Sequence, residues 1–522
     1  MLITEMLARN ARMFGMEIAL VEREPARNKR TEITWKTFDD RANQMADALV
    51  ARGVGKGDKV VHLLMNCIEW LPIYFGILRT GAWAVPLNFR FDGATIALCT
   101  EVAEAKIFIF GEEFIDRVNA IKGGLKTVER FVFVGPEVKR PAYAEPYDAL
   151  LASGRPLDPC IDLCVTDSAA LYFTSGTTGT PKATLLTHRN LEASCYIENS
   201  HHRQTHTDNF LCIPPLYHTG AKMHWFGSLM VGAKAVILKG IEPKWILEAV
   251  SEEKVTIVWL LVPWALDILF AIENRDVNLK NYDLSHWRLM HIGAQPVPPS
   301  LIKQWKKVFP HHQYDTNYGL TECTGPGCVH LGIENMHKVG AIGVPGFDSE
   351  TRIVDSNLNP VARGEIGELA VRSPCVMKEY YKNPQATREV LRDGWLLTGD
   401  MARQDEDGFI WLVDRKKDVV ITGGENIYPV ELENFLQAHP RIQDVAVIGL
   451  PSIRLGEIAA AVVQVKTGQH LSEEEVKEFC EGLPRYKRPR RIIFGAVPRN
   501  PTGKIEKPKL RELYGGRQEA IP

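Results

Sequence analysis

The sequence lacks an excess of charge of either sign. Its 522 residues include 62 lysines and arginines against 64 aspartates and glutamates, which leaves a formal net charge of −2 at pH 7. A chain with this balance has no overall attraction to nucleic acid or to an anionic membrane, and only a local basic patch could supply one. We therefore expect no nucleic-acid partner.

Cysteine is scarce and scattered. The closest pair among the ten cysteines, Cys160 and Cys164, has no histidine or further cysteine beside it, so we do not expect this pair to bind a metal. Reduced, buried thiols in a cytoplasmic protein are the simpler expectation. The first residues show no signal-peptide pattern, and residues 519–522 contain no peroxisomal or retention tripeptide.

A long uninterrupted apolar run is also missing. The best candidate, residues 255–272, contains Pro263 and Asp267 and lacks flanking basic residues. Residues 255–262 are more typical of a buried strand, and Pro263 is expected to begin a helix whose apolar face includes Leu266, Leu269 and Phe270. We therefore expect no stable membrane insertion.

The segments that are present alternate between strand and helix patterns. Residues 38–52 and 69–80 have helical periodicity, and residues 58–65 and 84–88 are strand-like. This alternation predicts an α/β fold with parallel sheets, in a chain long enough for more than one domain. A charge cluster at 413–418 marks the best boundary, so we expect domains at 1–416 and 417–522, the second a small α+β unit.

The most informative segment is residues 174–182, Thr-Ser-Gly-Thr-Thr-Gly-Thr-Pro-Lys, which follows an apolar strand-like run. Glycines let a backbone approach an anion closely, hydroxyl and N–H groups donate to phosphate oxygens, and a lysine adds a positive charge. Pro181 before Lys182 excludes the Walker pattern. We predict a polyphosphate-binding loop that includes Thr174, Ser175, Gly176, Thr177, Thr178, Gly179 and Lys182.

Five further segments follow this loop in the chain. They are residues 214–218 (Pro-Pro-Leu-Tyr-His), 317–322 (Asn-Tyr-Gly-Leu-Thr-Glu), 398–400 (Thr-Gly-Asp), 414–418 with 423–426, and 501–504 (Pro-Thr-Gly-Lys). With them the chain resembles the adenylate-forming superfamily of acyl-CoA synthetases, carrier-protein adenylation domains and beetle luciferases. The resemblance implies a large N-terminal domain of layered β-sheets and helices, a small mobile C-terminal lid, and the use of ATP, Mg²⁺ and coenzyme A.

Joining a carboxylate to the α-phosphate of ATP brings two anions together, so positive charge must offset their repulsion. By the resemblance, Lys504 bridges the two groups and Thr321 donates to the α-phosphate. Glu322 holds Mg²⁺, a hard cation suited to carboxylate and phosphate oxygens. Tyr318, within the segment that also contains Asn317 and Gly319, stacks on adenine.

The remaining nucleotide and coenzyme A contacts are carried over in the same way. Asp400 accepts hydrogen bonds from ribose, with Arg415 beside it, and Gly293, Ala294 and Gln295 line the adenine pocket, although Gln295 stands where the family has a small residue. Lys417 is the hinge. Gly423, Gly424 and Glu425 line the pantetheine tunnel, and candidates for the coenzyme A phosphates are Arg454, Lys487 and Arg488.

The acid itself is only partly constrained. Acetate-type relatives have a tryptophan where this chain has Gly319, so the resemblance implies a deeper acyl pocket. No aspartate near His218 is placed to pair with an α-ammonium group, so an α-amino acid is not expected. The expected wall is His218, Thr219, Gly220, Met223, Trp259, Val262, Gly293, Asn317, Gly319 and Cys323. Such an uncharged wall favours an aromatic, alicyclic or medium-chain acid, with His218 gating the site or contacting the carboxylate.

The leading hypothesis is an ATP-dependent carboxylate–CoA ligase, a monomer or homodimer, that forms an acyl adenylate and then a thioester. An adenylate-forming enzyme that loads a carrier protein is the alternative within the same chemistry. A luciferase-like oxygenase and a non-catalytic nucleotide-binding regulator are further alternatives. The intact Lys504, Glu322, Asp400 and Thr177 argue against the regulator.

Overall fold

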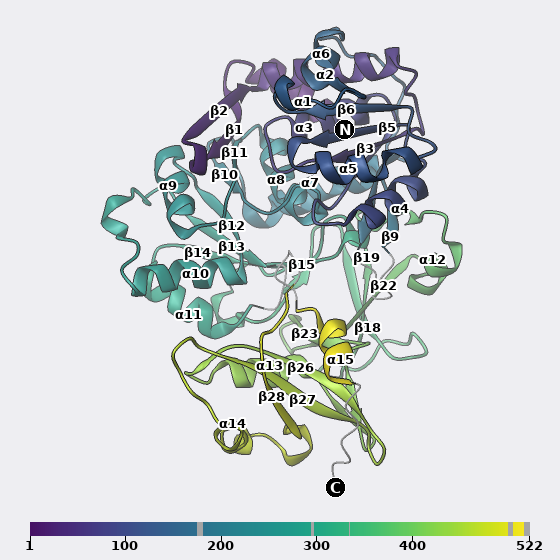
Figure 1. The fold of residues 1–522 in the computed structure, drawn as a ribbon. Coiled ribbons are helices and arrows are strands. Elements are labelled where there is room, and N and C mark those ends of the chain that lie inside the picture. The colour runs from purple at the N-terminus through teal and green to yellow at the C-terminus, as the bar shows by residue number, and fades with distance from the viewer. Residues whose placement is uncertain (175–180, 294–296, 333–334, 500–504, 516–522) are drawn as a thin grey trace.

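The computed structural model describes residues 1–174, 181–293, 297–332, 335–499 and 505–515, apart from the side chains of Met223 and His224. The expected α/β class is confirmed: layered sheets and helices form the larger part of the molecule, and a smaller group of strands and helices forms its C-terminal part (Figure 1).

The first large sheet has the strand order β14-β13-β12-β10-β11-β1-β2. All neighbours pair in parallel except β2, which is antiparallel to β1. Strands such as β12 and β13 are buried throughout, as expected for parallel strands covered on both faces. The bounds are β1 Ile18–Glu24, β2 Lys29–Thr34, β10 Asn209–Cys212, β11 Lys234–Leu238, β12 Ile257–Leu261, β13 Leu289–Gly293 and β14 Gln313–Asp315.

The second large sheet has the order β20-β9-β8-β4-β3-β5-β6-β7. Parallel pairing joins β8, β4, β3, β5, β6 and β7 in this order. At the β8 edge, β9 pairs antiparallel with β8, and β20 pairs antiparallel with β9. The bounds are β3 Lys59–Leu63, β4 Trp83–Pro86, β5 Ile107–Gly111, β6 Arg130–Val134, β7 Ala144–Pro146, β8 Ser168–Thr174, β9 Lys182–Thr187 and β20 Glu379–Tyr380.

One apolar core joins these two sheets. It contains residues of both sheets, such as Val60 and Ile257, together with large side chains from the helices between them, such as Phe38, Phe75 and Trp225. The helices of this part are α1 Ile3–Met13, α2 Trp35–Ala51, α3 Trp70–Arg79, α4 Gly93–Ala103, α5 Ile115–Ile121, α6 Tyr147–Ala152, α7 His188–His202, α8 Thr219–Val231, α9 Pro243–Glu253, α10 Val262–Glu273, α11 Pro299–Val308 and α12 Pro384–Val390.

Two smaller antiparallel sheets follow the first large sheet in the chain. One consists of β15 Asn317–Gly319, β16 Pro326–Val329 and β17 Val344–Pro345. The other has the order β18-β19-β22-β21 with β23 paired to β22, and its strands are β18 Glu350–Val354, β19 Gly367–Arg372, β21 Leu391–Arg392, β22 Trp395–Gln404 and β23 Ile410–Arg415.

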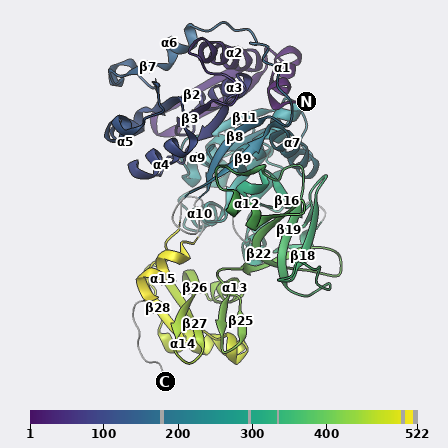
Figure 2. The ribbon, with the colours of Figure 1, turned by 90° about the vertical axis from the view of Figure 1, so that its right-hand side faces the viewer.

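The residues after Arg415 gather below the sheets, and Figure 2 shows the same separation from the side. Their sheet has the order β25-β24-β27-β26 with β28 beside β27, and it carries apolar clusters of its own. This arrangement supports the boundary expected at 416/417, which stays a prediction. The elements are β24 Val420–Thr422, β25 Glu425–Ile427, α13 Pro429–Gln437, β26 Ile442–Ser452, β27 Gly456–Val465, α14 Glu473–Phe479, β28 Arg491–Phe494 and α15 Lys507–Gly515.

Two local expectations are wrong. Phe270 is 42% exposed, because α10 turns this side chain away from the core that buries Leu269. Cys160 and Cys164 are exposed rather than buried, because both lie in the irregular segment between α6 and β8, although both are free thiols as expected. No helix within the described residues is long and apolar enough to cross a membrane.

Candidate active site

Several of the predicted site segments leave the same edge of the first large sheet. Gly293 is the last residue of β13, and the segment 317–322 begins just after Asp315, the last residue of β14. The segment 214–218 begins just after β10, the parallel neighbour of β12. Open α/β sheets bind ligands outside the carboxyl ends of their parallel strands. The topology therefore explains why segments far apart in the sequence meet.

The predicted phosphate loop connects two paired strands. Thr174 ends β8 and lies opposite Lys182, which begins β9. Between them, the predicted contacts Ser175, Gly176, Thr177, Thr178 and Gly179 lie outside the described residues. The Lys182 ammonium lies 4.8 Å from the centroid of the Tyr380 ring, a favourable cation–π distance. Tyr380 is a residue that the sequence analysis did not single out.

The same tyrosine holds the predicted magnesium ligand. Its hydroxyl donates to Glu322 Oε1 at 2.7 Å, and the backbone N–H of Met377 donates to the Glu322 carbonyl at 2.7 Å. Burial, followed by the negative charge of Glu322, raises the pKa of Tyr380. The hydroxyl thus stays protonated and orients the Glu322 carboxylate. Thr321 precedes Glu322 in the same short 3-10 turn, Thr321–Cys323.

Asp400, the predicted ribose contact, is held from two sides. Tyr318 donates its hydroxyl to Asp400 Oδ2 at 2.5 Å, and Arg415 Nε lies 2.6 Å from Asp400 Oδ1. Asp400 lies opposite Arg415 in the β22–β23 pair, so the sheet itself sets this ion pair. Burial, and then the Asp400 charge, raises the pKa of Tyr318 well above its usual value. The structure therefore brings three predicted site residues together.

Gly293, part of the expected acyl wall, could carry a methyl group without a clash. A Cβ atom built at Gly293 would have Thr316 Oγ1 as its nearest neighbour at 3.7 Å, followed by His291 Nε2 and Trp259 Nε1 at 3.8 and 3.9 Å. Side chains of the expected wall that are buried include Trp259, Val262 and Cys323. Ala294, Gln295 and the Met223 side chain lie outside the described part of the chain.

Gly319 has a structural role that the sequence analysis did not consider. A Cβ atom there would lie 2.8 Å from the backbone oxygen of Gly325 and 3.3 Å from Pro326 Cα. Because the obstacle is the backbone at the start of β16 and just before it, even a methyl group at this position would force β15 and β16 apart. Gly319 is thus required by the close approach of β15 and β16, whatever its effect on pocket depth.

His218 occupies the N-cap position of α8, and its ring centroid lies 4.2 Å from that of Tyr217. Lys222, one turn into the helix, is 1% exposed and donates to the carbonyls of Leu216 and His218 at 3.0 and 3.3 Å. Burial lowers the pKa of Lys222 well below its usual value. Lys222 therefore holds the loop that carries His218. In the sequence, the only sign of this role is that Lys222 is a single charged residue in a largely apolar helix.

The expected hinge and tunnel residues lie in turns. Lys417 has an exposed side chain in the turn after β23. Gly423 and Gly424 have φ angles of 58° and 90° and connect β24 to β25, a tight hairpin turn that favours glycine. Glu425 begins β25 with an exposed side chain. Lys504 lies outside the described residues, and Arg511 of the following helix pairs with Asp418 at 2.7 Å.

Two candidates for the coenzyme A phosphates already have intramolecular partners. Lys487 Nζ lies 2.7 Å from Glu431 Oε1, and Arg488 donates to the carbonyls of Leu483 and Glu481 at 2.9 and 2.7 Å. Arg454 has an exposed side chain. These contacts favour Arg454 over Lys487 and Arg488 as a phosphate ligand in the arrangement described.

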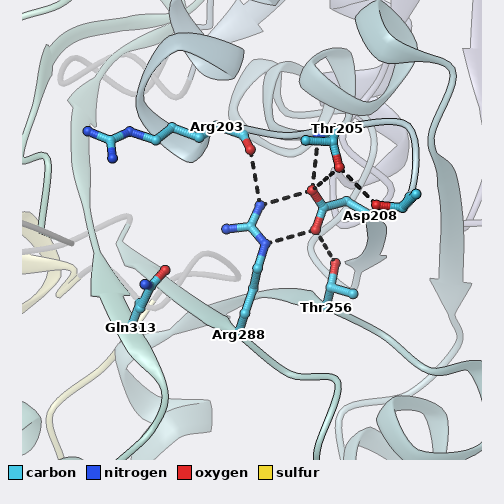
Figure 3. A pocket seen from close by; sticks show the side chains of 7 residues that line it. Arg203, Thr205, Asp208, Thr256, Arg288 and Gln313 are labelled. Atoms are coloured by element: carbon cyan, nitrogen blue, oxygen red, sulfur yellow. Dashed lines mark hydrogen bonds and ion pairs between the residues drawn. The ribbon is translucent and has the colours of Figure 1, made fainter.

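A separate open pocket of about 460 Å³ lies on the side of the first large sheet (Figure 3). Among the described residues that line it, none was predicted to belong to the active site. Asp208 and Arg288 dominate it, with Arg288 Nε and Nη2 donating to the Asp208 oxygens at 2.8 and 3.0 Å. Asp208 also accepts from the Thr256 hydroxyl at 2.6 Å. Because the two charges neutralise each other in a bidentate ion pair, we interpret the pair as a structural contact rather than a second active site.

The comparisons with known proteins agree with this geometry. The family described as "AMP-binding enzyme" matches residues 7–381, and "AMP-binding enzyme C-terminal domain" matches residues 431–504. The chain belongs to this family, and it is an ATP-dependent carboxylate–CoA ligase of the adenylate-forming superfamily.

Individual relatives are similar over nearly the full chain. The long-chain-fatty-acid–CoA ligase FadD13 of Mycobacterium tuberculosis is 31% identical, covering 92% of this chain and 93% of its own. The feruloyl-CoA synthase of an Amycolatopsis species is 33% identical, with 93% and 94% covered. The solved structure of the anthranilate CoA ligase AuaEII in complex with anthranoyl-AMP matches with a TM-score of 0.89 and 26% identity, over 98% and 97% of the two chains.

Proposed function

We propose that this ligase activates an apolar acid: aromatic, alicyclic or medium-chain. The observation that carries the proposal is that the expected wall brings no acidic or basic side chain other than histidine to Gly293, whose Cβ position has Thr316, His291 and Trp259 as its nearest neighbours at 3.7–3.9 Å. Pockets with mostly apolar walls and few polar groups suit apolar ligands. The relatives named as fatty-acid and feruloyl ligases are consistent with an acid of this kind.

In the first half-reaction, a carboxylate oxygen of the acid forms a bond to the α-phosphorus of ATP, and the bond to the leaving pyrophosphate breaks. We assign to Lys504 the neutralisation of the two anions, and to Thr321 a hydrogen bond to the α-phosphate. The residues of the 174–182 loop bind the outgoing phosphates through hydroxyl and N–H donors. Lys182, next to the Tyr380 ring, adds positive charge at the end of that loop.

The ribose contact is assigned to Asp400. Each of its oxygens already accepts from one protein donor, Arg415 or Tyr318. An ionised carboxylate has about four lone-pair sites, so both oxygens can still accept from a ribose hydroxyl. The two protein donors therefore orient the carboxylate without saturating it.

Mg²⁺ fits the donor set at Glu322. The carboxylate is half-buried, is oriented by the Tyr380 hydroxyl, and offers the oxygen ligands that this cation prefers. When bound, Mg²⁺ would offset the negative charge of the phosphates. Glu322 would hold the ion, and Tyr380 would keep the Glu322 carboxylate in position.

In the second half-reaction, the sulfur of coenzyme A attacks the carbonyl carbon of the acyl adenylate, the new C–S bond forms, and AMP leaves with the carboxyl oxygen. We assign Lys417 as the hinge that exchanges Lys504 for the Gly423–Gly424 turn. A turn without side chains suits a narrow thiol chain. Arg454 is the assigned phosphate contact.

The test is a pyrophosphate-release screen over a panel of carboxylic acids, with and without coenzyme A. We expect the highest kcat/KM with uncharged aromatic, alicyclic or medium-chain acids, and a thioester product with coenzyme A alone. A preference for acetate, dicarboxylates or amino acids would overturn the assigned acid class. Turnover that requires an added carrier protein would favour carrier loading instead.

A further inference from the structure

Three histidines and an aspartate that the ligase chemistry does not use meet in the interior behind Gly293. His201 and His202 end α7, His291 lies in β13, and Asp315 ends β14 directly opposite His291. All four side chains have an exposed fraction of 0%. One candidate ligand atom of each lies within 4.8 Å of those of the other three.

The separations suit a single small cation. Asp315 Oδ2 lies 3.4 Å from His201 Nε2 and 3.6 Å from His202 Nε2. His291 Nδ1 lies 4.0 Å from the same oxygen and 2.8 Å from His202 Nε2. A tetrahedral zinc ion with bonds of about 2.0–2.1 Å holds its ligand atoms about 3.3 Å apart. These separations bracket this value, so small side-chain adjustments would bring all four atoms to one ion.

The outer contact of His201 leaves its inner nitrogen as an electron-pair donor. His201 Nδ1 lies 3.0 Å from the carbonyl oxygen of Ile197, which can only accept, so Nδ1 carries the proton and the neutral ring offers a lone pair at Nε2. A hydrogen bond to a carbonyl or carboxylate is the usual outer contact of a metal-binding histidine. His202 Nδ1 lies 2.8 Å from Glu198 Oε1 and 3.5 Å from the Gln204 amide nitrogen, and a metal would replace the 2.8 Å hydrogen bond between His202 Nε2 and His291 Nδ1.

Backbone hydrogen bonds hold one oxygen of Asp315 and leave the other facing the histidines. Its Oδ1 accepts from the backbone N–H groups of Thr316 and Gly332 at 2.8 and 3.2 Å. Among the described residues, neither Asp315 Oδ2 nor His201 Nε2 has a hydrogen-bond partner. Leaving such a buried group unsatisfied destabilises the folded state, and a buried anion needs a positive partner. Two facing acceptors are both satisfied by a cation between them.

We propose that His201, His202, His291 and Asp315 bind one divalent transition metal, most suitably Zn²⁺, in a closed structural site. Four protein ligands leave no open position, as is typical of structural rather than catalytic zinc. The carboxylates of Asp315 and Glu198 balance the two positive charges. The metal ties the end of α7 to β13 and β14. Arg288 secures the same helix end, since its Nη2 donates to the His202 carbonyl at 3.1 Å.

The proposed metal site lies next to the expected acyl pocket and would stabilise its wall. His291 Nε2 lies 3.8 Å from the Cβ position at Gly293, so the metal-bound histidine stands directly behind the expected acyl wall. Binding of the metal fixes the carboxyl end of β13 on which Gly293 lies. The site therefore supports the wall without contacting the reacting atoms.

The test is elemental analysis of the full-length protein, produced in zinc-supplemented medium and purified without chelator. We expect about one zinc per chain, as for a single four-ligand site, and at least a tenfold loss in Asp315→Asn and His201→Asn. His312→Asn is the matched control, because His312 is a buried histidine packed on Phe309 outside the cluster. A metal-free wild-type protein, or undiminished zinc in both cluster variants, would overturn the proposal.

A measurement on the unmodified chain covers the case in which the variants fail to fold. Growth with Co²⁺ in place of Zn²⁺ should give the intense visible absorption of a tetrahedral ion with nitrogen and oxygen ligands. A thiolate charge-transfer band would assign the metal to cysteine and contradict the proposed ligands. Cobalt-loaded protein without tetrahedral absorption would contradict the proposed geometry.

Discussion

Replacement of Tyr380 by phenylalanine tests whether the Glu322 carboxylate is held for MgATP. The change removes the hydroxyl that donates to Glu322 Oε1 at 2.7 Å and keeps the ring that lies 4.8 Å from Lys182 Nζ. A hydrogen bond to a charged group contributes about 1.5–3 kcal/mol, which corresponds to a roughly 10- to 150-fold loss. We expect Tyr380→Phe to lower kcat/KM for MgATP by that factor, and to affect kcat/KM for coenzyme A much less.

The assay is steady-state pyrophosphate release at varied MgATP, with a double-mutant cycle that combines Tyr380→Phe and Glu322→Ala. If the hydroxyl acts through Glu322, its loss should have little further effect once Glu322 is replaced. Tyr381→Phe is the matched control, because the Tyr381 hydroxyl contacts Glu104 at 3.4 Å instead. Unchanged MgATP kinetics in Tyr380→Phe, or fully additive losses with Glu322→Ala, would refute the reasoning.

Further predictions concern the packing around two glycines and the role of Lys504 in the two half-reactions. Gly319→Ala should destabilise the fold by about 1–3 kcal/mol and lower the thermal midpoint, because its Cβ would lie 2.8 Å from the Gly325 oxygen. Gly293→Ala should change the midpoint little, since the nearest atom to its Cβ lies at 3.7 Å, and should shift the pyrophosphate-release profile towards smaller acids. Lys504→Ala should nearly abolish adenylate formation yet leave the attack of coenzyme A on supplied acyl-AMP largely intact, measured as separate half-reactions.

Each of these expectations has an outcome that contradicts it. Equal thermal midpoints for Gly319→Ala and Gly293→Ala would show that strand approach does not explain Gly319. An unchanged acid profile in Gly293→Ala would remove Gly293 from the acyl wall. Equal losses in both half-reactions of Lys504→Ala would contradict the role assigned to that lysine.

The sequence predicted which segments form the site better than it predicted which distant residues contact them. Strand and helix patterns predicted the α/β layering, and the composition of 174–182 predicted a loop at the end of a strand, because these signals are local. The contact between Tyr380 and Glu322 joins residues 58 positions apart, and no local pattern specifies it. Its two ends meet only because β20 adds to the edge of the second large sheet.

The cluster proposed to bind a metal was missed for the same reason. His201 and His202 look like ordinary polar residues at a helix end, and His291 and Asp315 lie singly in short strands. Only the parallel pairing that sets His291 opposite Asp315, and the packing of the end of α7 against them, brings the four together. The exposure of Phe270 depends likewise on the position of α10 against the core, which helical periodicity fixes only approximately.

The central claim is that the carboxylate of an apolar acid attacks the α-phosphorus of ATP to give an acyl adenylate. The most direct measurement uses the preferred acid labelled with oxygen-18 in its carboxyl group, with mass analysis of the AMP after complete conversion to the thioester. The account predicts that AMP carries a labelled oxygen on its phosphate. Unlabelled AMP, or label in inorganic phosphate formed together with ADP, would contradict it.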